Sequence, residues 1–178
     1  MAPVGVPGLV LGGGISFFSN LRGWACDNVE SYEVVTASGL IVNATPNSYS
    51  NLYWALRGGG SNFGIVTNFK LHAFPLGQMW GGQRIFTENN FAAVLDAVYK
   101  FAKTGSAKDT DAAEIVSFGN IAGVGKIAIV QMHYAKPIAN ASAFSDFSVL
   151  KPIADNTGLG SLADMTVKMD EGAADGQR

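Results

Sequence analysis

The sequence predicts an α+β fold, and two patterns predict this class. Residues 29–42 and 65–74 alternate apolar with polar positions and are rich in β-branched side chains, as half-buried strands are. Residues 90–102 place apolar side chains at the spacing of a helix. Two further strand-like segments follow at 113–120 and 126–134.

The first part of the chain combines these strands with glycine-rich loops. Residues 29–42 are expected to form a hairpin with its turn at Ser38-Gly39, because a short polar pair that ends in glycine favours a tight turn. Residues 47–56 predict a short helix that ends before Gly58. The strand at 65–74 stops at Pro75.

The second part predicts the order strand, helix, strand, strand, helix. The first strand covers residues 80–86, the helix 90–102, and a last short helix 139–147. Residues 155–160 are expected to be a loop, and residues 162–169 fit either a helix or a strand. The boundary between the two parts is predicted near residues 75–77, where proline and glycine interrupt the pattern.

Charge and hydropathy exclude several kinds of partner. A net charge of −2 gives no basis for binding nucleic acid or an anionic membrane surface. No apolar run approaches the roughly 18 residues that cross a bilayer. One cysteine and two widely separated histidines predict neither a disulfide framework nor a metal site.

Two glycine-rich segments are the most informative feature. Residues 8–15 contain Gly12-Gly13-Gly14, and residues 54–67 contain Gly58-Gly59-Gly60 followed by Ser61 and Asn62. Glycines let a ligand approach the backbone closely, so the pair suggests two backbone walls around one large cofactor. Neither segment has the spacing of a dinucleotide fingerprint or a Walker A loop. Taken singly, the first triple glycine also fits a flexible loop or a bulge, and the second also fits the end of a helix and a turn of the chain.

Five other residues are interpreted structurally. Cys26 is expected to be a small buried hydrophobe, and Asp27-Asn28 a turn with side chain-to-backbone hydrogen bonds. His72 and His133 are expected on the solvent or interface face of strands. The sequence names no catalytic residue.

Four segments in order resemble the second half of the flavin-binding domain of the vanillyl-alcohol oxidase and p-cresol methylhydroxylase (PCMH) superfamily. The berberine bridge enzyme-like branch, especially its fungal members, matches best. The segments are residues 4–14, 23–29, 33–39 and 51–67. The match from residue 78 onward is looser. The resemblance implies the C-terminal part of a PCMH-type FAD-binding domain at residues 1–77, and a partial α+β substrate-binding domain at 78–178.

The resemblance also implies FAD as cofactor and a small-molecule substrate. Residues 5–9 would run beside the flavin and its ribityl-pyrophosphate chain, Ile15 would pack nearby, and Ser61 and Val66 would hold the adenosine end. The cofactor-binding residues so implied are Gly5, Val6, Pro7, Gly8, Leu9, Gly12, Gly13, Ile15, Ser61, Gly64 and Val66.

The sequence departs from the family pattern in two ways. Pro7 stands where the family usually has glycine, which removes one N–H donor. The family's flavin-linking histidine would lie upstream of Met1, its linking cysteine would align with Met1 and not with Cys26, and its tyrosine-containing catalytic segment would lie downstream. We therefore expect a fragment or a truncated gene product that alone binds FAD poorly and turns nothing over.

Three functions remain open at this stage. The resemblance favours an FAD-linked oxidase that moves a hydride from an alcohol, sugar or secondary metabolite to flavin and then reduces oxygen. The alternatives are a catalytically inactive remnant or binding module, and a flavin dehydrogenase that does not use oxygen. Asn43-Ala44-Thr45 and Asn140-Ala141-Ser142 are glycosylation sequons and fit a secreted protein, although they do not establish the location.

Overall fold

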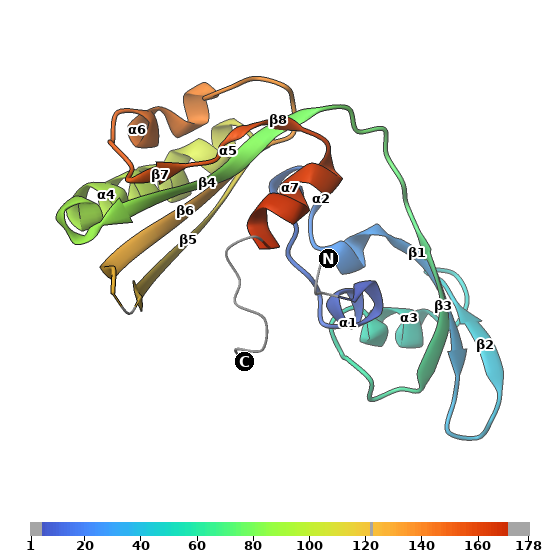
Figure 1. Cartoon of the computed structure of the whole chain (residues 1–178). Helices are drawn as coiled ribbons and strands as arrows, with labels where there is room; N and C mark the ends of the chain where they lie inside the picture. The colour runs from blue at the N-terminus through green and yellow to red at the C-terminus, as the bar shows by residue number, and fades with distance from the viewer. Residues whose placement is uncertain (1–4, 122, 171–178) are drawn as a thin grey trace. The chain divides into compact units, whose positions relative to one another are not determined.

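The computed structural model describes residues 5–121 and 123–170, with side chains described as far as residue 167. The chain divides between Pro75 and Leu76 into two compact units. We call residues 5–75 the first unit and the described residues from Leu76 onward the second unit. Figure 1 shows the helices and strands of each unit.

The first unit is built on a three-stranded antiparallel sheet in the order β2-β1-β3. The hairpin is confirmed, with Val35 opposite Ile41 and Gly39 in the turn at φ +81°. Its strands are β1 (Val29–Val35), β2 (Ile41–Ala44) and β3 (Ile65–Leu71). Its helices are α1 (Val6–Leu11), α2 (Ser19–Arg22), the 3₁₀ turn η1 (Ala25–Asn28) and α3 (Ser50–Leu56).

One face of this sheet forms the core of the first unit. Tyr32 is fully buried and its ring contacts those of Tyr53 and Phe69. Val10 of α1 and Leu56 of α3 belong to the same cluster, so the two short helices that flank the glycine segments are fixed by apolar packing.

The second unit contains a larger antiparallel sheet in the order β5-β6-β4-β7, with β8 also paired to β4. The strands are β4 (Met79–Thr87), β5 (Ala112–Ile121), β6 (Gly125–Tyr134), β7 (Ala154–Asp155) and β8 (Gly158–Gly160). The helices are η2 (Glu88–Asn90), α4 (Phe91–Lys100), the π-helical turn η3 (Phe101–Gly105), α5 (Ser106–Lys108), η4 (Ser142–Phe144), α6 (Ser145–Ser148) and α7 (Leu162–Asp170).

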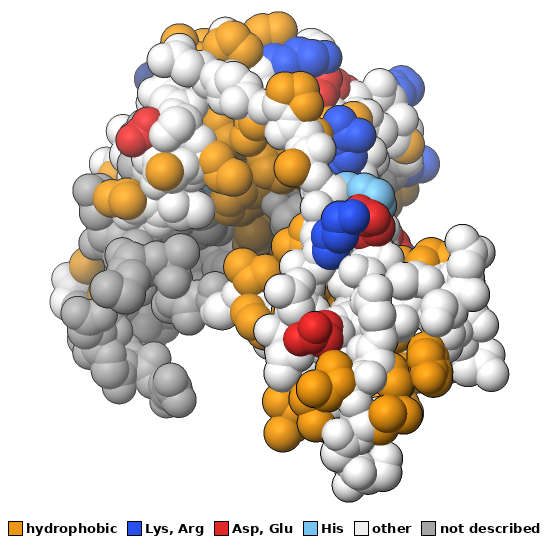
Figure 2. Space-filling view, turned by 90° about the vertical axis from the view of Figure 1, so that its right-hand side faces the viewer, with side chains coloured by type: hydrophobic (Ala, Val, Ile, Leu, Met, Phe, Trp, Pro, Cys, Tyr) orange, Lys and Arg blue, Asp and Glu red, His pale blue; other side chains and the backbone are white. Residues whose placement is uncertain are grey.

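Alternation along the strands separates the two faces of the larger sheet. Trp80, Phe86 and Val130 share one core with Val94 of α4 and Phe147 of α6, so these helices cover one face. Figure 1 shows α7 on the opposite side of β4 from α4 and α6. Several large hydrophobic side chains stay exposed in both units, and orange groups interrupt the white surface in Figure 2.

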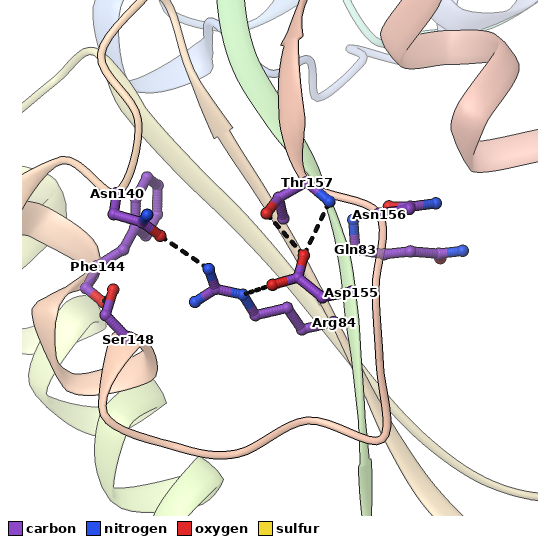
Figure 3. Close-up of polar contacts among 8 residues, drawn as sticks. All are labelled: Gln83, Arg84, Asn140, Phe144, Ser148, Asp155, Asn156 and Thr157. Atoms are coloured by element: carbon purple, nitrogen blue, oxygen red, sulfur yellow. Dashed lines mark hydrogen bonds and ion pairs between the residues drawn. The ribbon is translucent and has the colours of Figure 1, made fainter.

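A polar cluster under the helix layer joins three segments of the second unit (Figure 3). The Arg84 side chain on β4 is only 8% exposed. Its Nε donates to Asp155 Oδ2 at 2.9 Å, and its Nη2 donates to Asn140 Oδ1 at 2.7 Å. Burial raises the pKa of Asp155, but hydrogen bonds from Thr157 and Arg84 outweigh burial and hold that pKa below its usual value. The Asp155 carboxylate therefore stays charged at neutral pH.

Three predicted elements differ from the structure. The segment 155–160 is not a loop, because β7 and β8 pair with β4. The helix expected at 47–56 begins only at Ser50, after Tyr49 in a left-handed conformation. The helix expected at 139–147 begins at Ser142 as a 3₁₀ turn.

His133 also differs, since it is 1% exposed and not on a solvent face. It lies between Gly81 and Ala113 on neighbouring strands, and burial lowers its pKa to about 4. His72 is exposed, as expected. The undecided segment 162–169 is helical in α7.

Glu114 offers a test of the second unit's core. It lies opposite Met132, on the strand face that the helices cover, and burial raises its pKa to about 8. An acid whose pKa is higher in the folded state destabilises the fold as pH rises from its unfolded value of about 4.5 toward 8. We expect the unfolding free energy of Glu114→Gln, relative to that of wild type, to be higher at pH 9 than at pH 5 by at least about 1 kcal/mol. Urea denaturation at the two pH values measures this difference.

The matched control is Glu88→Gln, which removes an exposed carboxylate paired with Lys126. An equal difference between variant and wild type at both pH values would contradict the burial of a protonated Glu114.

Candidate functional site

The two glycine-rich segments lie against each other in the first unit. The amide of Gly60 donates to the carbonyl oxygen of Leu11 at 3.0 Å. Leu11 is the last residue of α1, and Gly60 follows α3. The two glycine-rich segments are therefore in contact through one direct hydrogen bond between their backbones.

The first triple glycine is held in place by the segment that follows it. Gly13 and Gly14 have φ values of +100° and +83°, which favour glycine. Their carbonyl oxygens accept from Cys26 N and Ala25 N, each at 2.8 Å. A Cβ on Gly14 would lie 2.8 Å from the Cβ of Ala25. The segment is an irregular loop whose backbone is fixed by these hydrogen bonds and close contacts.

A hollow of about 590 Å³ opens beside both glycine segments. Trp24 and Trp54 contribute to its wall and are 54% and 75% exposed. Its lining consists of Gly12, Gly13, Trp24, Cys26, Asp27, Trp54, Ala55, Arg57, Gly58, Gly59 and Phe63. Of the predicted cofactor residues, only Gly12 and Gly13 line this hollow.

The lining of the hollow includes an ion pair between Arg57 and Asp27, which the sequence alone did not connect. Arg57 Nη2 donates to Asp27 Oδ1, while Asp27 Oδ2 accepts from Trp24 N at 2.9 Å. The backbone hydrogen bond from Trp24, followed by the Arg57 contact, lowers the pKa of Asp27. The side-chain amide of Asn28 donates through Nδ2 to the backbone carbonyl oxygens of Arg22 and Trp24. The predicted turn at Asp27-Asn28 is thus confirmed, and Cys26 is buried as expected.

The remaining N-terminal residues of the predicted set surround α1. Gly5 precedes the helix, and Val6, Pro7 and Gly8 form its exposed first turn. Leu9 is partly buried, and Ile15, beyond the triple glycine, is 70% exposed. Amides of a first helical turn have no acceptor inside the helix. Proline at position 7 therefore costs α1 no internal hydrogen bond, because the N–H group at this position would have no acceptor within the helix.

The other predicted residues lie at the start of β3. Ser61 is exposed, and Val66 packs partly into the core opposite Val34. Gly64 has φ +140°, and a Cβ there would lie 2.5 Å from the carbonyl oxygen of Val35. The close approach of β1 and β3 thus requires glycine at this position.

The described residues hold no cluster of three or more His, Cys, Asp or Glu side chains that could bind a metal. Among them there is also no helix long and apolar enough to cross a membrane. What this part of the first unit offers a ligand is therefore exposed backbone, aromatic walls and one ion pair.

Comparison with known proteins places this geometry among flavoproteins. No family model matches the chain. It is 40% identical over 149 residues to the bifunctional solanapyrone synthase of Alternaria solani, covering 84% of this chain and 28% of that protein. It is 60% identical over 83 residues to an FAD-dependent monooxygenase of Cochliobolus heterostrophus, covering 47% of this chain and 16% of that protein. The structure of a VAO-type flavoprotein of Myceliophthora thermophila matches with a TM-score of 0.72 and 25% identity, over 92% of this chain and 31% of that one.

These matches define first a class, the flavoproteins with the VAO-type fold. Within that class the chain is similar in sequence to FAD-dependent monooxygenases and FAD-linked oxidoreductases. The cofactor named for these relatives is FAD. The chain spans about a third or less of the length of these relatives.

Gly64 gives a test of the local fold at this site. Gly64→Ala would place a methyl group against Val35 and require a left-handed conformation, so we expect a loss of about 2 kcal/mol or more in unfolding free energy. Gly77→Ala is the matched control, because nothing lies within 4 Å of a Cβ at Gly77. Chemical denaturation of both variants measures the difference. Equal stability of the two would mean that β1 and β3 do not approach as closely as described.

Proposed function

We propose that the chain forms part of an FAD-dependent oxidoreductase. Residues 1–77 supply the C-terminal part of its FAD-binding domain, and residues 78–178 the beginning of its substrate-binding domain. The observation that carries this proposal is the contact between the two glycine segments, next to a hollow lined by glycines and aromatic side chains. Two glycine-rich segments that meet at one place expose their backbone, and a flat, phosphorylated cofactor can approach an exposed backbone closely.

The residues around α1 fit this cofactor. Nothing lies within 4 Å of a Cβ built on Gly5 or Gly8, and neither glycine has positive φ. Neither local crowding nor backbone conformation therefore explains glycine at these positions, whereas the need for open backbone does. Val6 and Gly8 would offer free amides to phosphate oxygens, and Ser61 and Val66 would contact the adenosine end. Bound FAD would supply the acceptor for a hydride from a substrate carbon.

We further propose that the complete protein is an oxidase that returns these electrons to oxygen, with an alcohol, a sugar or a secondary metabolite as substrate. Relatives named as monooxygenases support a reaction with oxygen. A flavin dehydrogenase that excludes oxygen is the second candidate. A remnant without redox activity is the third.

Titration of the purified chain with FAD tests the cofactor proposal. We expect weak, reversible binding, seen as flavin bands between about 300 and 550 nm that are released on unfolding, and no turnover. Gly8→Val should weaken binding about tenfold or more, or about 1.4 kcal/mol, because its side chain would enter the space meant for the cofactor. Its thermal midpoint should not fall, because the space is empty and valine is a better helix former than glycine.

The control is Gly119→Val in β5, which also points into open space but lies in the second unit. Equal FAD binding by both variants would reject the role of Gly8. No binding by the wild-type chain would favour the remnant. Flavin that co-purifies and survives denaturation would overturn the expected location of the linking residues outside this chain.

A further inference from the structure

The two sequons occupy different structural environments. Asn43 lies within strand β2 of the first unit, opposite Glu33 of β1. Asn140 lies in an exposed turn of the second unit, between β6 and η4, with φ +49°. Asparagine tolerates this left-handed conformation better than most residues. An acceptor asparagine in a surface turn is the usual setting for N-glycosylation.

The hydroxyl group of the first sequon is already used by the fold. Thr45 Oγ1 accepts hydrogen bonds from Ser48 N at 2.9 Å and from Asn47 N at 3.2 Å. The Thr45 and Ser48 backbones also form an isolated bridge. Thr45 is therefore explained by the turn that follows β2.

The hydroxyl group of the second sequon is not explained in this way. Ser142 is exposed, begins η4, and its hydroxyl makes no hydrogen bond to another described residue. A sequon needs this hydroxyl two residues after the asparagine. The fold thus accounts for Thr45 but not for Ser142.

The amide of Asn140 is divided between the interior and the solvent. Oδ1 accepts from Arg84 Nη2 at 2.7 Å, as Figure 3 shows. Nδ2 donates no hydrogen bond to any other described residue, and the residue is exposed. Because the buried Arg84 guanidinium donates to Oδ1 of Asn140, Nδ2 is the side-chain atom of Asn140 that is available to react.

We propose that Asn140 is an N-glycosylation site when the chain enters a secretory compartment. The donor would be an oligosaccharide on a polyprenyl diphosphate. Asn140 Nδ2 forms a bond to the sugar C1, the bond from C1 to the diphosphate oxygen breaks, and the proton lost from Nδ2 passes to the solvent. No oxidation or reduction occurs. The product is still an amide, so Oδ1 continues to accept from Arg84 and the polar cluster of the second unit is preserved.

Cell-free translation of the full chain, with an added secretory leader and microsomes, tests the site. The Asn43→Gln variant isolates the second sequon. We expect the Asn43→Gln variant translated with microsomes to migrate more slowly on a denaturing gel than the same variant translated without them. Treatment with an N-glycosidase should reverse this shift in migration. That enzyme converts a modified asparagine to aspartate, which mass spectrometry should locate at position 140.

The matched control adds Ser142→Ala to Asn43→Gln, which leaves Asn140 and its bond to Arg84 unchanged. We expect this double variant to lose the shift entirely. An unshifted Asn43→Gln chain, or a shift that survives Ser142→Ala, would overturn the proposal. Neither result depends on flavin binding, so the oxidoreductase proposal stands or falls separately.

Discussion

The hydrogen bond from Gly60 to Leu11 is the contact on which the first unit's proposed role depends. It joins two segments that are far apart in sequence at backbone-to-backbone distance. A Cβ on Gly59 would lie 2.2 Å from the carbonyl oxygen of Ala55, so the turn that follows α3 requires glycine at this position. The packing of Val10 and Leu56 into one core holds α1 and α3 at this separation. Apolar burial thus positions a surface made of backbone.

The second unit depends on a different constraint, a charged side chain beneath a helix layer. A buried guanidinium is costly unless its donors find acceptors, and Arg84 donates from Nε to Asp155 and from Nη2 to Asn140, which lie in two later segments. Their attachment to β4 through Arg84 explains how two residues of β7 can complete the sheet edge.

Local patterns predicted the long elements because their signals lie within the elements themselves. The hairpin and strands β4, β5 and β6 follow from alternation, and α4 from helical spacing. Strands β7 and β8 escaped prediction because a two- or three-residue strand among Asn, Thr and Gly becomes extended only through its partner β4. The burial of His133 and the pairing of Arg57 with Asp27 depend on contacts between distant residues, which no local pattern contains. The glycine segments were visible in sequence, but their hydrogen bond was not.

The glycines themselves separate what the fold needs from what a cofactor would need. Gly13, Gly14 and Gly64 combine positive φ with close neighbours, so a protein that only kept this fold would still require them. Gly5 and Gly8 have neither positive φ nor a neighbour that a Cβ would meet. Glycine at Gly8 even costs about 1 kcal/mol of helix stability relative to alanine. The fold gives no reason for that cost, whereas a backbone left open to a flavin nucleotide does. Gly5 and Gly8 therefore add to the support that the contact between the two glycine segments gives the proposed FAD site.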